Sequence, residues 1–129
     1  MTEYICLDKK PKIDGFTQLP NFLFESSLYS NLSSDAKVLY AMLLRRTELS
    51  RKNAWADEAG RIYIYFTIEE VTELLHCGRQ KAVNTMQELK IASLISVKKQ
   101  GCGRPNRIYP RIVERVQFAD DLHYESQKP

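Results

Sequence analysis

The chain has 129 residues, 43% of them apolar, and 19 Lys or Arg against 16 Asp or Glu give a formal net charge of +3. This size suits one domain with a single modest core. No apolar run approaches the roughly 18 residues of a membrane-spanning helix, and the N-terminus lacks the regions of a secretory signal. We therefore expect a cytoplasmic protein with no membrane association.

The three cysteines, Cys6, Cys77 and Cys102, lie far apart in the sequence. An odd count without a C-x-x-C spacing argues against both a disulfide framework and a zinc site. We therefore expect ordinary reduced cysteines, no metal and no cofactor. Cys102 falls in a predicted loop and is also a candidate reactive thiol.

The N-terminal part of the chain predicts an arm followed by a small helix. We assign residues 1–15 to the arm, in which residues 4–7 could form a short strand. Pro20 is well placed to begin a helix over 21–26, because its fixed φ suits the first helical position. The apolar run FLF in this helix is typical of a core segment, and a partner-binding arm is the alternative.

A longer amphipathic helix is predicted from Ser33 or Ser34, which are candidate N-caps, to about residue 48. Arg45 and Arg46 would then occupy its last turn, where positive charge complements the helix dipole. A phosphate contact is the weaker alternative for the two arginines.

A polar loop over 50–60 follows, and we expect its Trp55 to fold back onto the edge of the core. Residues 61–66 (RIYIYF) are rich in β-branched and aromatic residues and predict a strand.

The next stretch predicts two helices joined by a tight turn. Thr67 and Glu70 have the spacing of a capping box, in which each side chain bonds the backbone of the other residue. Gly78 interrupts the apolar periodicity, and Arg79 opens a second periodic run. A helix pair joined by a short glycine-containing turn is typical of a helix-turn-helix.

Two extended runs, 94–99 and 107–113, flank the glycine-rich sequence QGCGRPN and predict a β-hairpin. The expected fold is therefore α+β: a winged helix-turn-helix with a helical core and a small antiparallel sheet as its wing. We assign residues 16–115 to this domain. We expect residues 116–129 to form a tail or a linker towards a further C-terminal domain, and a closing helix is the open alternative.

The positive charge of the chain is concentrated in the second helix and the wing. Residues 79–115 hold nine Lys or Arg against two Asp or Glu, a net charge of +7, whereas the segments on either side are each −2. A surface that faces DNA phosphates needs this polarity, because neutralised phosphates release condensed counterions. A solvated basic face without a partner is the alternative interpretation.

Helical periodicity divides the second helix into two faces. The predicted inner face consists of Ala82, Val83, Met86 and Leu89. The predicted outer face consists of Arg79, Gln80, Lys81, Asn84, Thr85 and Glu88. Arg pairs bidentately with guanine, and Gln or Asn with adenine, so this face can read bases in the major groove.

Lys81 and Thr85 are better candidates for phosphate contacts, which position a protein without reading sequence. Glu88 would mark the far edge of the footprint or accept from a cytosine amino group. The candidate wing contacts are Lys98, Lys99, Gln100, Arg104, Asn106 and Arg107. Glycines at the tip permit close approach to a phosphate, and an Arg there suits a narrow minor groove.

Four runs carry a more specific pattern: FTQLPNFLFES, LSSDAKVLYAMLLRRTELS, NAWADEAGRIYIYFTIEEVTELLHCGRQKAVNTMQELKIASLI and GRPNRIYP. The combination W-x-D-E-x-G-R-I-Y-I-Y-F-T-I-E-E is far more specific than a generic helix-turn-helix. From about Phe16 to Val113 the chain resembles the N-terminal domain of the replication initiator protein A (RepA_N) family. Its fold is also similar to the N-terminal domain of DnaD-type primosomal proteins.

The resemblance implies a replication initiator of a plasmid or other mobile element of Gram-positive bacteria. Such a domain binds double-stranded DNA at repeated origin sites (iterons), usually as a homodimer. A separate C-terminal region engages host replication proteins, so the chain resembles an isolated DNA-binding domain. The groove-reading role falls on Arg79, Gln80, Lys81, Asn84 and Thr85, and the wing role on GRPN. Gly78 stands where Ser or Thr is more usual, which affects only a capping bond.

Other function classes are less consistent with the sequence. His76 and His123 are the only histidines, and no G-x-S-x-G, H-E-x-x-H or P-loop motif is present, so we expect no enzyme. His76 is instead interpreted as a capping or surface residue. Two binding alternatives remain open: a transcriptional repressor of the same fold, and a winged helix that binds proteins of the primosome.

Overall fold

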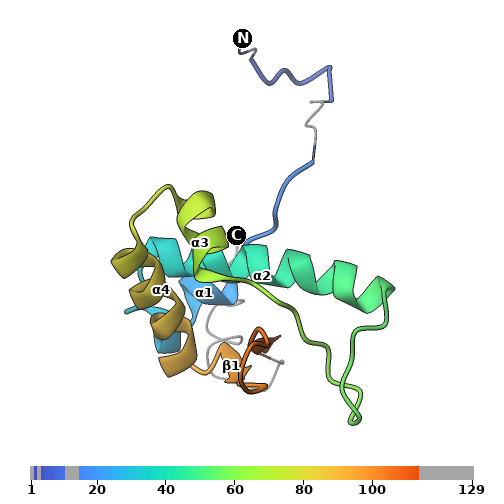
Figure 1. Ribbon diagram of the computed structural model, residues 1–129. Coiled ribbons are helices and arrows are strands. Elements are labelled where there is room, and N and C mark those ends of the chain that lie inside the picture. Colours follow the sequence, from blue (N-terminus) through green and yellow to red (C-terminus); the bar gives the residue numbers. More distant parts are fainter. Residues whose placement is uncertain (1, 3, 11–14, 114–129) are drawn as a thin grey trace.

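The computed structural model describes residues 2, 4–10 and 15–113, in which helices pack around a small core and lead into a β-hairpin (Figure 1). The elements in chain order are α1 (Phe22–Glu25), a 3-10 helix (Ser27–Tyr29), α2 (Ser34–Lys52), α3 (Ile68–Leu75), α4 (Arg79–Ile91), β1 (Ile95–Lys98) and β2 (Arg107–Pro110). The predicted α+β class and the order of helix pair and hairpin are confirmed. The predicted tail, residues 116–129, lies outside the described residues.

The core is built on one face of α2, against which α3, α4 and β2 pack. Its fully buried large side chains are Leu23, Leu39, Tyr40, Leu43, Ile64, Val71, Leu89 and Leu94. Among them, Tyr40 donates its hydroxyl to the backbone carbonyl of Arg111, just beyond β2. Burial raises the pKa of Tyr40, so the hydroxyl stays protonated and keeps donating. This bond connects the first half of α2 to the residue that follows β2.

Helix α2 begins as predicted and ends later. The Ser33 hydroxyl accepts from the backbone N–H of Ala36 and caps the helix. The helix continues to Lys52, so the expectation that Arg45 and Arg46 lie in its last turn is wrong. Arg46 instead donates to the Glu70 carboxylate (3.0 Å) and to the Tyr65 carbonyl (3.2 Å). It therefore joins α2 to α3 and to the segment before it, and is not aligned with a helix end.

The helix pair has the predicted local geometry. Both bonds of the capping box between Thr67 and Glu70 are present at the start of α3. His76 ends α3 in the left-handed region (φ 52°, ψ 50°), and its backbone N–H bonds the carbonyl of Thr72. Its side chain is exposed, as expected of a capping or surface residue. Helix α4 begins at Arg79 as predicted, and its N-cap residue, Gly78, makes no side-chain capping bond.

The hairpin pairs β1 and β2 in antiparallel register, with Val97 opposite Ile108 and Lys98 opposite Arg107. Both strands are shorter than the predicted runs 94–99 and 107–113. The predicted strand over 61–66 is reduced to single pairs. Ile64 exchanges two backbone hydrogen bonds with Ile108 (2.8 and 2.9 Å). The segment around Ile64 therefore lies beside β2 as a short third segment of the sheet.

The N-terminal segment departs most from the sequence predictions. No strand forms over residues 4–7, whose described side chains are exposed, and these residues extend away from the helices in Figure 1. The short α1 buries Leu23 fully but leaves Phe24 59% exposed, with the Lys37 ammonium 4.6 Å from the centre of its ring. Only part of the FLF run therefore belongs to the core. Within the described residues, none of the helices has the length and apolarity to cross a membrane.

Replacing Thr67 by Ala should lower the free energy of unfolding by about 1 kcal/mol, because the backbone N–H of Glu70 loses its capping acceptor. Urea unfolding followed by circular dichroism measures the change. Thr67→Ser keeps the hydroxyl and serves as the control. Equal stability of the Ala and Ser variants would contradict a role for the cap.

Candidate nucleic-acid interface

Helix α4 packs against the core along a stripe of four residues, one of which differs from the predicted set. Its buried residues are Ala82, Thr85, Met86 and Leu89. The prediction that Thr85 lies on the outer face is wrong, since only 2% of it is exposed and its hydroxyl donates to the Lys81 carbonyl (2.7 Å). Val83 was assigned to the inner face and is 39% exposed. Thr85 is thus removed from the candidate contacts, and Val83 joins the outer face.

The outer face of α4 carries an amide pair near its N-terminus. Gln80 Nε2 donates to Asn84 Oδ1 (3.0 Å), one helical turn away, and both residues are exposed. The bond fixes the two amides side by side on the surface. Amides in this position can pair with adenine in a major groove.

The two basic residues at the start of α4 are bound to carboxylates of neighbouring helices. Arg79 Nη1 lies 2.9 Å from Glu69 on α3, and Lys81 Nζ lies 2.8 Å from Asp35 on α2. Hydrogen bonding to Asp35, and then its charge, raise the pKa of Lys81. All four side chains are substantially exposed, so water screens both pairs and they can exchange for other anions at little cost.

Glu88 has a structural partner. Its two carboxylate oxygens accept from the backbone N–H (2.9 Å) and the hydroxyl (2.7 Å) of Ser33, at the N-cap of α2. The carboxylate therefore joins α4 to the start of α2 and also lies at the positive end of that helix. It is occupied here, which argues against the predicted cytosine contact.

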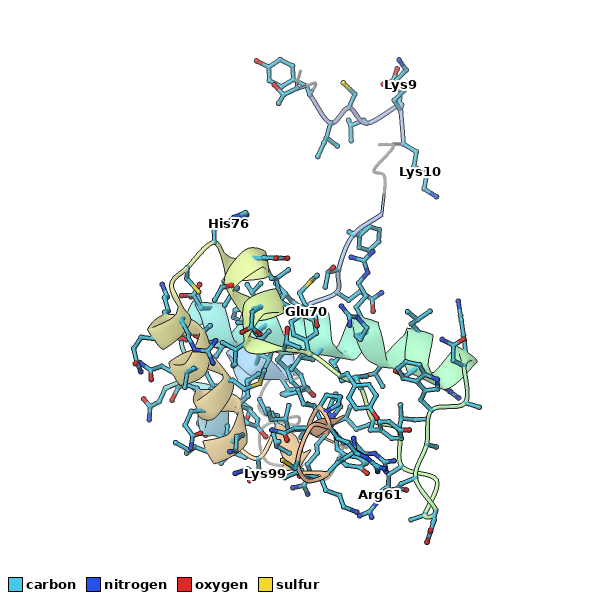
Figure 2. The ribbon with its side chains drawn as sticks, in the orientation of Figure 1. Lys9, Lys10, Arg61, Glu70, His76 and Lys99 are labelled. Carbon is cyan, nitrogen blue, oxygen red and sulfur yellow. The ribbon has the colours of Figure 1, made fainter. Side chains whose placement is uncertain are left out.

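The wing presents basic side chains around a tip that needs glycine. Lys98, Lys99 and Arg104 are exposed. Gly101 and Gly103 have φ angles of +102° and +78°, which side-chain-bearing residues rarely adopt. Figure 2 shows Lys99 at the hairpin end of the molecule, away from His76 in the turn between α3 and α4.

Gln100 and Arg107 are also wing candidates, and both are partly engaged within the protein. Gln100 Nε2 donates to the Pro105 carbonyl (2.8 Å) and to the Tyr65 hydroxyl (3.3 Å). It therefore holds the wing tip against the segment that contains Tyr65. The Arg107 guanidinium lies 4.2 Å from the centre of the Tyr63 ring, at the base of the hairpin. Asn106 is exposed at the end of the tip.

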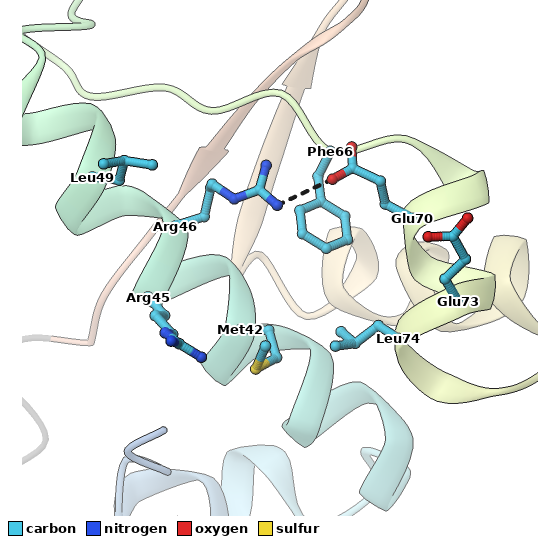
Figure 3. Close-up of a pocket in the computed structure, with 8 residues that line it drawn as sticks. All are labelled: Met42, Arg45, Arg46, Leu49, Phe66, Glu70, Glu73 and Leu74. Atoms are coloured by element: carbon cyan, nitrogen blue, oxygen red, sulfur yellow. Dashed lines mark hydrogen bonds and ion pairs between the residues drawn. The ribbon is translucent and has the colours of Figure 1, made fainter. Parts of the chain in front are cut away.

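A groove of about 510 Å³ lies between α2 and α3 (Figure 3). It is lined by Met42, Arg45, Arg46, Leu49, Phe66, Glu70, Glu73 and Leu74. Two arginines face two glutamates, and the Arg46–Glu70 ion pair spans part of it. The groove therefore has no excess positive charge for a phosphate. The alternative phosphate role of the two arginines gains no support from this arrangement.

Sequence reasoning missed three exposed residues on the outer side of α4: Val83, Gln87 and Lys90. The spacing i, i+3, i+4, i+7 from Ala82 includes Thr85 and would have given the correct buried stripe. The polarity of Thr85 hid that pattern, although a threonine hydroxyl can bond a carbonyl of the preceding turn and be buried.

With this geometry established, comparisons with known proteins decide the family. The family model for the replication initiator protein A (RepA) N-terminus matches residues 15–122. The chain belongs to this family. A 41 kDa protein of Lactobacillus helveticus is 34% identical over 100 residues, which are 73% of this chain and 28% of that protein. The chain thus spans little more than a quarter of this curated relative.

Several solved structures that are similar to this chain in sequence have the same fold. The N-terminal domain of a DNA binding protein is 32% identical, with a TM-score of 0.72 and full coverage of both chains. A Rep–DNA complex is 32% identical, with a TM-score of 0.71 and coverage of 98% of this chain and 99% of that one. An MDR initiator is 31% identical, with a TM-score of 0.72 and coverage of 90% and 92%. The predicted resemblance and winged-helix fold are confirmed.

Gln100→Ala should loosen the wing tip without unfolding the domain, because the Pro105 carbonyl and the Tyr65 hydroxyl lose their shared donor. Backbone 15N order parameters of residues 101–106 should fall, with a change in unfolding free energy of about 1 kcal/mol or less. Gln80→Ala makes the same substitution on α4 and should leave the tip unchanged. Identical tip order in both variants would show that Gln100 does not hold the loop.

Proposed function

We propose that the chain binds double-stranded DNA sequence-specifically at repeated origin sites (iterons), as the DNA-binding domain of a plasmid or mobile-element replication initiator. Helix α4 enters the major groove, and the basic wing lies on the backbone and in the minor groove. This assignment places the protein in the cytoplasm and gives this domain no enzymatic role.

The observation that carries the proposal is the exposed polar and basic face of α4, which the exposed cations of the wing follow along the chain. The amide pair Gln80–Asn84 and the exchangeable cations Arg79 and Lys81 lie on the open face of α4. The wing adds the exposed cations Lys98, Lys99 and Arg104. The amides can read base edges, while the cations neutralise phosphates. The revised outer face adds Val83, which can contact a thymine methyl, and Gln87.

The comparisons support the same assignment. A relative of 32% identity was solved as a Rep–DNA complex, and its chain is matched over nearly its full length. We extend the proposal to a homodimer on adjacent repeats and, in an initiator that includes this domain, to host replication proteins recruited by its C-terminal region. The domain boundaries that we propose are 1–15 for the arm, 16–115 for the winged helix and 116–129 for the tail or linker.

Selection of bound duplexes from random DNA distinguishes this proposal from a protein-interaction module. A sequence-specific domain should return one motif, and paired copies at fixed spacing would indicate a dimer. An interaction module would return no motif and bind duplexes weakly. A repressor of the same fold would also return a motif, so the motif must next be located: repeats within an origin favour initiation, and a site overlapping a promoter favours repression.

Gln80→Ala or Asn84→Ala should relax base preference at particular positions of the selected site, with about 1–3 kcal/mol of discrimination lost at each. Fluorescence anisotropy with single-base variants of the site measures this loss. Gln18→Ala, an exposed glutamine distant from α4 in the sequence, is the control. An equal loss of affinity for all duplexes would mean that these residues do not read bases.

Alanine at Lys98, Lys99 or Arg104 should weaken binding to every sequence and flatten its salt dependence. Removing one phosphate-binding cation changes the slope of log K against log salt by about 0.9 for duplex DNA. Lys52→Ala, at the end of α2, removes an exposed lysine away from the wing. A slope that is the same in the wing and Lys52 variants would remove the wing from the interface.

A further inference from the structure

The sheet consists of β1, β2 and the short segment around Ile64. Its outer face carries a cluster of aromatic rings that the proposed duplex interface does not use. Ile64 and Ile108 point to the core, so their neighbours along the chain point to the opposite face. We call this the aromatic face; it consists of Trp55, Tyr63, Tyr65 and Tyr109, with Arg61 and Arg107.

The rings contact one another in one continuous cluster. Trp55 stacks on Tyr63, with centroids 6.5 Å apart and planes at 21°. Tyr63 meets Tyr65 edge to face at 5.6 Å, and it lies 6.0 Å from Tyr109. Arginine guanidinium groups lie over two of the same rings, Arg107 over Tyr63 at 4.2 Å and Arg61 over Tyr109 at 5.8 Å.

This cluster is open to solvent at Trp55. Trp55 contacts two rings and is nevertheless 44% exposed. The sheet is already held by the backbone bonds between Ile64 and Ile108 and by the burial of both side chains on the core side. The exposed tryptophan of this cluster is therefore not needed to close the core, and its flat apolar surface is available to a ligand.

The charges around the aromatic face favour an anionic ligand. Arg61 is paired with Asp57 at 3.0 Å, which cancels its charge in part. Arg107 faces Lys98 across the hairpin, on the same side of the sheet. Two further cations, Lys99 and Arg104, lie exposed in the loop between these strands. The face therefore combines aromatic rings with a net positive charge.

We propose that the aromatic face binds single-stranded DNA. Bases stack on aromatic rings without sequence preference, and arginines beside the rings neutralise the backbone. A proline-rich peptide, the other common ligand of tyrosine and tryptophan rows, does not require the arginines. Gln100 bonds both the wing tip and Tyr65, so the aromatic face begins where the wing ends. One strand of a duplex opened beside the wing would reach this face directly.

The chain reports on this binding by itself, because Trp55 is its only tryptophan. Oligo(dT) of about 12 nucleotides, within the usual span of such sites, should quench the emission of Trp55 in a salt-dependent titration. The Trp55→Leu variant should bind fluorescein-labelled oligo(dT) about tenfold more weakly than the original chain, the change expected when one base can no longer stack. Its affinity for the selected duplex should be unchanged.

Phe24→Leu is the matched control, since it also replaces an exposed aromatic residue by leucine, on α1. It should change oligo(dT) binding less than about twofold, since no stacking partner of a base is removed. Unchanged Trp55 emission at saturating oligo(dT), or equal weakening by both variants, would overturn the proposal. So would quenching by a proline-rich peptide and not by oligo(dT). If the original chain binds the selected duplex but not oligo(dT), only the proposal of single-stranded DNA binding is rejected. If the original chain binds no duplex, the proposed function is rejected.

Discussion

The structure depends on the burial of one face of α2. Leu39, Tyr40 and Leu43 are fully buried there, and α3, α4 and β2 all pack on the same helix. At about 25 cal/mol per Å² of apolar surface removed from water, such a face is the main source of stability in a domain this small. Polar contacts then fix the neighbours in place: Glu88 joins α4 to the N-cap of α2, and Tyr40 joins α2 to the end of the hairpin.

Much of this arrangement was readable in the sequence because it is encoded locally. The capping box of Thr67 and Glu70, the break at Gly78 and the glycines of the wing tip each depend on residues within one or two turns. Such signals keep their meaning wherever the segment packs. The order of helix pair and hairpin, and with it the fold class, followed from them.

The sequence predictions were wrong where contacts between distant segments determine the burial or the partner of a residue. Thr85 is buried because the Lys81 carbonyl satisfies its hydroxyl, and its polarity gave no sign of this. The role of Arg46 depends on Glu70, 24 residues away. Residues 61–66 form only isolated pairs, of Ile62 with Ala56 and of Ile64 with Ile108 in β2, and both pairs depend on segments outside the run. The sequence thus predicted the helix and the hairpin that carry the candidate site, but which of their side chains face outward had to come from the structure.

The backbone pairing of Ile64 with Ile108 also affects how the domain folds. The helix pair and the hairpin close over short stretches of chain, whereas this pairing joins a residue that precedes the helix pair to the second strand of the hairpin. The entropy of closing the longer loop must be met before the pairing contributes any stability. A partly folded protein can therefore have its helix pair and its hairpin formed while the segment around Ile64 is not yet paired with β2. In such a state Tyr63 and Tyr65 have no strand beneath them, so the aromatic face belongs to the fully folded domain alone.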